Sequence, residues 1–101
     1  MAGEKTPLKW KFETGGEVRS IPEVSDGVVY FGSFDHHLYA LDVKTGKEKW
    51  KFQTGGNFKS SPAVSDGVVY FGSSDNHLYA VDIKIAEKLA HNVGMSFINL
   101  T

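Results

Sequence analysis

The chain has 101 residues, of which 41% are hydrophobic and 23% charged, and its formal net charge is −1. This composition is typical of a globular domain, and the lack of cysteine excludes disulfides, thiolate metal sites and a cysteine nucleophile. Acidic and basic residues are interspersed, and no apolar run approaches the roughly 20 residues that span a bilayer, so we expect no nucleic-acid partner and no membrane insertion.

The N-terminal lead, residues 1–7, precedes any regular pattern. The opening "MAGEKTPLKW" lacks the apolar core of a signal peptide, so we expect a soluble chain without export, while the compartment stays undetermined. Residues 8–14, "LKWKFET", alternate in polarity, which places Trp10 and Phe12 on one face of a predicted strand.

A repeat with a period of 40 residues follows. Residues 9–44 align with residues 49–84, and 26 of the 36 aligned pairs are identical. Such uniformity indicates a recent duplication or deliberate design. The repeat region is taken as residues 8–84, and residues 85–101 form a non-repeat tail.

Each repeat is expected to fold as short antiparallel strands, a to d. Asp26-Gly27 and Asp66-Gly67 each stand between two β-rich runs, which is a strong hairpin signal because both turn positions favour positive φ. Pro22 fits an edge strand, because proline cannot donate to a ladder. The predicted spans are 17–24, 28–33, 37–43 and 47–53, then 57–64, 68–73 and 77–83.

The turn between strands b and c differs between the copies. It carries His36 in the first repeat and Asn76 in the second. Asparagine tolerates the left-handed region better than histidine, so slight strain is expected at His36.

The strand order is therefore d-abc-d-abc, with residues 8–14 as a first strand d. Four antiparallel strands repeated at about 40 residues are typical of β-propeller blades. The predicted fold class is all-β, with two four-stranded antiparallel propeller blades and a short helical tail.

The second copy departs from the pattern after Lys84. Ile85, Ala86, Leu89 and Ala90 fall at helical spacing, which predicts a helix over residues 85–92. The following "MSFINLT" is expected to form a short strand or a frayed end. This tail is either a cap for an exposed sheet or foreign sequence.

One run resembles a known family motif. Ala40-x-Asp42-x-x-Thr45-Gly46-x-x-x-Trp50 is similar to the tryptophan-docking motif of pyrroloquinoline-quinone-type propeller repeats. Asp42 is expected to accept backbone N–H groups of the Thr45-Gly46 turn, and Trp50 to dock against a neighbouring blade. Trp10 lacks this complete frame, so Trp50 is expected to contribute more to stability.

The resemblance covers residues 8–84 and implies several functions. The family includes eight-bladed quinoprotein dehydrogenases and an outer-membrane assembly scaffold, and its members are often periplasmic or extracytoplasmic. A quinone site would draw its parts from many blades, so no catalytic residue and no cofactor are predicted. His36, His37 and His77 would form a metal cluster only if two turns met, and no metal site is predicted.

The favoured hypothesis is self-assembly as a homo-oligomer, with a scaffold or interaction module as the alternative and a quinoprotein fragment as a less favoured one. The first strand d has no blade, and the second strand c has no strand d after it, so the two should pair between copies. A tetramer of eight blades is favoured, then a trimer. The rival outcome is that "MSFINLT" completes its own second blade. The expected clasp residues are Leu8, Trp10, Phe12, Leu78, Ala80 and Asp82.

Overall fold

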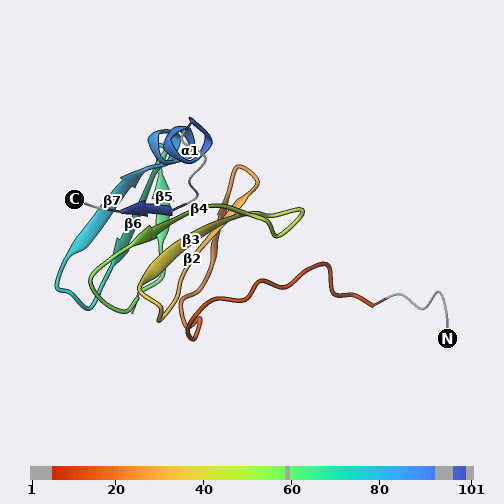
Figure 1. Ribbon diagram of the computed structural model, residues 1–101, viewed down its shortest axis with the longest axis horizontal. Helices are drawn as coiled ribbons and strands as arrows, with labels where there is room; N and C mark the ends of the chain where they lie inside the picture. Colours follow the sequence, from red (N-terminus) through yellow and green to blue (C-terminus); the bar gives the residue numbers. More distant parts are fainter. Residues whose placement is uncertain (1–5, 59, 93–96, 100–101) are drawn as a thin grey trace.

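The computed structural model describes residues 6–58, 60–92 and 97–99, which form two β-sheets facing each other and one helix across one end of them (Figure 1). The first sheet contains β1 (Glu23–Ser25), β2 (Val28–Gly32), β3 (His37–Asp42), β4 (Glu48–Gln53) and β8 (Phe97–Asn99). The second contains β5 (Ala63–Ser65), β6 (Val68–Gly72) and β7 (Leu78–Asp82), and the helix is α1 (Ile83–Asn92). The predicted all-β class with a helical tail is confirmed.

Strands β1 to β4 form a complete four-stranded antiparallel blade in the order expected from the repeat. The second sheet has the order β5-β6-β7, and in the described part of the chain no fourth strand pairs with β7. The second blade is therefore left one strand short, because the residues that would form its strand d are helical in α1.

The hairpin turns have the backbone that the sequence predicts. Asp26 and Gly27 have φ values of 51° and 75°, and Asp66 and Gly67 have values of 51° and 76°. Two consecutive residues at positive φ make the tight turn whose twist matches the flanking strands. Each Asp-Gly pair thus sets the register of its hairpin.

His36 and Asn76 also have positive φ, 75° and 72°. We expect His36→Asn to raise the free energy of unfolding by up to about 1 kcal/mol, because asparagine adopts this conformation with less steric penalty. The reverse change, Asn76→His, should lower it by a similar amount. Urea denaturation of both variants measures the pair, and a destabilised His36→Asn variant would contradict this account.

The edge strands β1 and β5 are shorter than the predicted spans 17–24 and 57–64, so the prediction is wrong for the N-terminal part of each span. β1 begins after Pro22, which has no N–H to donate. Upstream, the backbone ladder is replaced by a side chain, because the hydroxyl of Ser20 accepts the Gly32 N–H at 2.8 Å. Ser60 makes the same contact with Gly72 at 2.9 Å.

Residues 8–14 do not form the predicted strand d. They run as an extended segment beside the first sheet (Figure 1), and no described residue pairs with them in a ladder. A strand exists only against a partner strand, and the expected partner belongs to another blade. We call residues 8–16 the N-terminal arm.

The helix begins at Ile83, two residues before its predicted start at 85. Asp82 caps it, because its Oδ1 accepts the N–H of Ile85 at 2.9 Å. The inner face consists of Ile83, Ala86 and Ala90, which pack against the core. Within the described residues, no helix is long and apolar enough to cross a membrane.

The C-terminal strand β8 pairs in parallel with β4 of the first sheet. The rival prediction, in which "MSFINLT" completes its own second blade, is therefore wrong for the described residues 97–99. β4 offered a free outer edge close to the end of α1, and β8 pairs there rather than beside β7.

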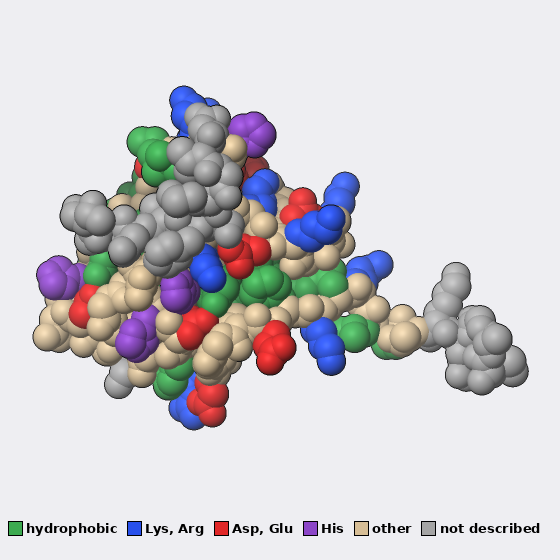
Figure 2. Space-filling view, viewed as in Figure 1, with side chains coloured by type: hydrophobic (Ala, Val, Ile, Leu, Met, Phe, Trp, Pro, Cys, Tyr) green, Lys and Arg blue, Asp and Glu red, His purple; other side chains and the backbone are tan. Residues whose placement is uncertain are grey.

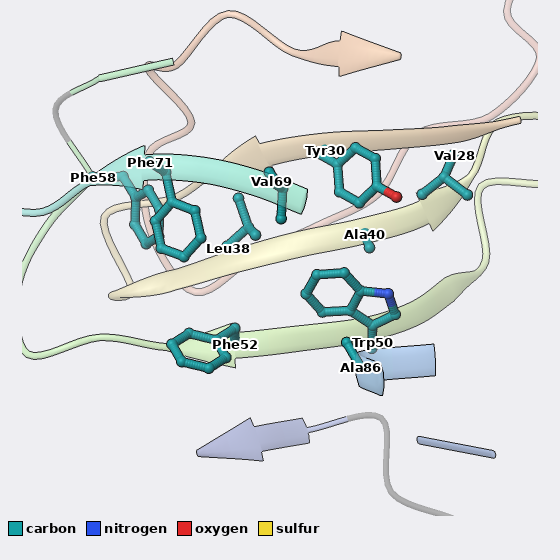
Figure 3. Packing of buried hydrophobic residues seen from close by; sticks show 10 residues of the cluster. All are labelled: Val28, Tyr30, Leu38, Ala40, Trp50, Phe52, Phe58, Val69, Phe71 and Ala86. Carbon is teal, nitrogen blue, oxygen red and sulfur yellow. The ribbon is translucent and has the colours of Figure 1, made fainter. Parts of the chain in front are cut away.

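The core lies between the two sheets (Figure 3). Alternate residues of β2 and β3, together with Trp50 and Phe52 of β4, face the second sheet. From the second sheet, Val69 and Phe71 meet them, and Phe58 stacks on Phe71 with ring centroids 5.0 Å apart. The two repeats therefore pack against each other through an apolar interface.

Candidate functional site

The turn between β3 and β4 is built by its aspartate. Asp42 Oδ1 accepts the N–H groups of Lys44 and Thr45 at 2.8 and 3.0 Å, and Gly46 donates its N–H to the Asp42 carbonyl at 2.8 Å. The bonds from Thr45 and Lys44 hold the pKa of Asp42 below its usual value. The carboxylate therefore fixes the conformation of the loop that contains Gly46.

That turn receives Trp10 of the arm. The indole Nε1–H of Trp10 donates to the Val43 carbonyl at 3.0 Å. A Cβ on Gly46 would lie 2.5 Å from the Trp10 ring, so only glycine leaves room for the indole. Trp50, the tryptophan of the same repeat, points instead toward the second blade (Figure 3). The Gly46 turn thus holds Trp10 of the arm and not the tryptophan of its own repeat.

Trp50 meets a different surface. The segment that corresponds to the Gly46 turn in the second repeat is the first turn of α1, where Ala86 lies next to the Trp50 indole (Figure 3). Trp50 is 0% exposed, and its Nε1 has no hydrogen-bond partner among the residues that the structure describes. The carbonyl of Ile83, the counterpart of Val43, lies inside the helix, where carbonyls accept the N–H four residues on. Replacing the turn by a helix has removed the acceptor.

A second joining contact is centred on Asp35 in the first repeat. Its Oδ2 accepts the N–H of Gly15 from the arm at 3.0 Å and the hydroxyl of Tyr39, and its Oδ1 accepts the N–H of His37 at 3.2 Å. Thr14 and Ser33 join their hydroxyls at 2.9 Å beside it. The arm is therefore attached to the first blade at two points.

The second repeat has the same contact. Asp75 Oδ2 accepts the N–H of Gly55 at 3.0 Å and the hydroxyl of Tyr79, and Oδ1 accepts the N–H of His77 at 3.0 Å. Gly55 lies just after the end of β4. The arm therefore contacts the first blade in the same way as the end of β4 contacts the second blade.

Both aspartates are held ionised. The hydroxyl of Tyr79, followed by the N–H groups of Gly55 and His77, lowers the pKa of Asp75 to about 2, although partial burial opposes the shift. At Asp35, burial alone would raise the pKa, but the bonds from Tyr39 and its neighbours outweigh it, and the pKa lies below its usual value. The joining contacts therefore depend on carboxylates rather than on neutral acids.

We expect this contact to give the protein an acid-sensitive stability. A carboxyl group whose folded pKa is lowered adds stability that is fully present above its unfolded value, near 3.8, and is lost as the pH falls toward 2. The slope of unfolding free energy against pH, from urea denaturation between about pH 4 and pH 2, should be shallower in Asp75→Asn than in the wild type. Asp66→Asn, which removes an exposed turn carboxylate, is the control, and an equal slope in Asp75→Asn and wild type would refute the assignment.

Among the described residues, no strand pairs with the outer edge of β7. Leu78 is 77% exposed, whereas its counterpart Leu38 is 0% exposed, because β4 pairs with β3 and the second blade covers it. Ala80 and Asp82 are also exposed. A cavity of about 610 Å³ follows this edge, and its lining includes Gly55, His77, Leu78, Tyr79 and Ala80.

The arm presents the matching half of the expected clasp. Trp10 and Phe12 are partly buried against the outer face of the first sheet, and Leu8 is 62% exposed. Within one chain the arm and β7 belong to different blades. The arm projects from the body beside the first sheet (Figure 1), so the structure does not bring the two halves together.

Residues 5–93 match the family model described as outer membrane protein assembly factor BamB. The chain belongs to this PQQ_2 family. The resemblance to pyrroloquinoline-quinone-type propeller repeats, predicted from the docking motif, is thereby confirmed. No curated protein sequence matches the chain significantly.

Solved propellers superpose on the PQQ_2 repeats. BamB from Moraxella catarrhalis has a TM-score of 0.66 at 20% identity, over 73% of this chain and 23% of BamB. A europium-containing methanol dehydrogenase scores 0.65 at 21% identity, over 74% of this chain and 17% of its own. Quinohemoprotein alcohol dehydrogenase ADHIIG from Pseudomonas putida HK5 scores 0.63 at 30% identity, over 74% and 13%. The chain spans less than a quarter of each.

The remaining candidate ligands of this PQQ_2 chain are its histidines. His37 and His77 occupy equivalent positions in separate blades, where the Nδ1 of each lies 2.9 and 3.0 Å from the carbonyl of its own Asp35 or Asp75. Among the residues that the structure describes, no three His, Asp or Glu side chains gather in a way that would hold a metal ion.

The aspartate contacts between neighbouring repeats were not predicted from the sequence. The signal was present, because Asp-x-His-x-Tyr occurs at 35–39 and again at 75–79, and Thr-Gly-Gly occurs at 14–16 and 54–56. Two invariant polar motifs at the same offset, one ending a strand and one opening the next hairpin, point to a bond between neighbouring repeats.

Proposed function

We propose that this chain is a self-assembling propeller fragment, in which the arm of one copy supplies strand d to the second blade of another. One observation carries this proposal. In the described part of the chain, no strand pairs with the outer edge of β7, and β8 pairs with β4 instead. The arm is held on its own first blade by the Asp35–Gly15 contact, which recurs as the Asp75–Gly55 contact between the end of β4 and the second blade.

The repeat fixes the expected register of the clasp. β3 and β4 pair with Leu38 opposite Phe52 and Ala40 opposite Trp50. Shifting β3 forward by 40 residues, and β4 back by 40 to the arm of another copy, sets Leu78 opposite Phe12 and Ala80 opposite Trp10. Leu8 then lies near the Asp82 end of β7. An exposed strand edge is a template for pairing of this kind.

The contact joins two different surfaces, so it propagates head to tail and closes only when the rotation per chain divides a full turn. Four copies with two blades each make an eight-bladed ring, which we favour, and three copies make a six-bladed ring. The role proposed is non-catalytic, because the sites found serve to join blades. The near-identity of the repeats supports a duplicated or engineered origin.

The experiment is native mass spectrometry of the full chain, alone and with excess peptide of residues 6–16. We expect a tetramer that the peptide converts to smaller species by capping β7. A peptide with Trp10→Ser and Phe12→Ser is the matched control and should have no effect. A single-chain mass would overturn self-assembly, and an unchanged mass in a variant lacking residues 1–14 would overturn the clasp.

The second candidate is a scaffold that binds another protein, and the match to the BamB family model favours it. The same open edge would then accept an extended segment of a partner. A chain that stays single at high concentration, yet binds the peptide of residues 6–16, would support this candidate over self-assembly.

A further inference from the structure

We infer that Leu78 of one copy inserts into an apolar cavity between the N-terminal arm and the first sheet of the next copy. This inference rests on the proposed self-assembly and adds a specific contact between sheet faces to the strand pairing. The inference rests on two apolar surfaces, one beside the first sheet and one on the second sheet.

The first surface is the cavity, with a volume of about 290 Å³. It is lined by seven apolar residues, which are Trp10, Phe12, Val18, Pro22, Val29, Phe31 and Leu41. Figure 2 shows hydrophobic side chains at the surface where the arm leaves the body, with charges of both signs around them. Val18, at the mouth of the cavity, is 49% exposed.

The same seven positions exist 40 residues on, at Trp50, Phe52, Phe58, Pro62, Val69, Phe71 and Val81. There the space is filled. Phe58 is 1% exposed and presses on the opposite sheet, where a Cβ on Gly32 would lie 2.3 Å from its ring. Leu38 of that sheet belongs to the same cluster and points toward Val69 and Phe71 (Figure 3).

The second surface is the outer face of the second sheet. Shifting Leu38 by 40 residues gives Leu78, the most exposed of the large hydrophobic residues described. Tyr70 and Ala80, counterparts of the buried Tyr30 and Ala40, are exposed beside it. The chain thus carries an exposed Leu78 on its second sheet and an unfilled apolar cavity beside its first sheet. The match between them identifies the occupant of the cavity as Leu78 of a second copy.

The contact between two copies should be weaker than the contact between the two blades of one chain. Val18 is smaller than Phe58, which fills the equivalent position between the blades. Val18→Phe should fill the mouth of the cavity and reach Gly72 of the adjoining copy, as Phe58 reaches Gly32. We expect the concentration at which the assembly dissociates to fall by about tenfold. Light scattering over a dilution series measures this, and a higher dissociation concentration would contradict the contact.

The direct test uses the absence of cysteine. Copies with Leu78→Cys and copies with Val18→Cys are unfolded, mixed, refolded together and treated with a short bis-maleimide. A covalent two-chain product is expected in the mixture and not in either variant alone. Ile85→Cys, an exposed position on the outside of α1, replaces Leu78→Cys as the control and should give no product.

The outcomes separate this inference from the proposed function. Cross-linking of Leu78→Cys copies to one another would show a symmetric contact and overturn the inference. A tetrameric mass without the mixed product would overturn the inference and leave self-assembly standing. A single-chain mass would overturn both.

Discussion

Replacing Trp50 by alanine is expected to lower the free energy of unfolding by about 3–5 kcal/mol, because a fully buried indole is lost from the middle of the interface between the two sheets. The ring also contacts Tyr30, with centroids 5.9 Å apart. No hydrogen bond to the described part of the chain is lost, since Nε1 has no partner there. Urea denaturation followed by circular dichroism measures the change.

Trp10→Ala is the matched comparison and should lower the same free energy by about 2 kcal/mol, because the indole is only partly buried and makes one hydrogen bond. Phenylalanine variants keep an aromatic ring but remove the indole N–H. Trp10→Phe should therefore lose the hydrogen bond to Val43, whereas Trp50→Phe should lose no hydrogen bond to a described residue. Equal losses for the two alanine variants would show that burial does not govern the difference.

Replacing Gly46 by alanine should lower the free energy of unfolding by about 3 kcal/mol. Its φ of 75° carries a penalty of roughly 1–2 kcal/mol for any residue with a Cβ. The added atom would also lie 2.5 Å from the Trp10 ring, so the indole must leave its place. Thermal and urea denaturation measure the loss.

Gly27→Ala isolates the backbone effect. Gly27 has the same φ of 75°, but a Cβ there meets nothing within 4 Å. The excess loss in Gly46→Ala over Gly27→Ala therefore measures the docking of Trp10. In a Trp10→Ala background that excess should disappear, and an excess that persists would assign it to something other than the indole.

The sequence was sufficient for what depends on short-range chemistry. Asp-Gly pairs favour positive φ, so the sequence predicts both hairpins at their observed turns, and the apolar spacing after Lys84 predicts the helix. The helix start at Ile83 was missed because an aspartate that caps a turn in the first repeat caps a helix in the second. The same residue serves both, and local pattern does not choose between them.

The sequence was insufficient where the partner of a segment lies elsewhere. Residues 8–14 have the pattern of a strand, yet they pair with nothing described in their own chain. For residues 95–101 the sequence predicts either a short strand or a frayed end, and the pairing of β8 with β4 depends on where α1 places the chain. The docking motif was recognised, but sequence order paired its turn with Trp50, whereas three-dimensional order pairs it with Trp10.

The contrast between the two indoles gives the protein a built-in pair of optical probes. Trp50 is fully buried, and no described residue accepts a hydrogen bond from its N–H, so its fluorescence should lie toward the blue and resist quenching by iodide. Trp10 is partly open to water on the arm, so its emission should lie further to the red and be quenched. Unfolding should therefore change the emission of Trp50, and assembly of two copies should change the emission of Trp10. A single unlabelled sample distinguishes the two events.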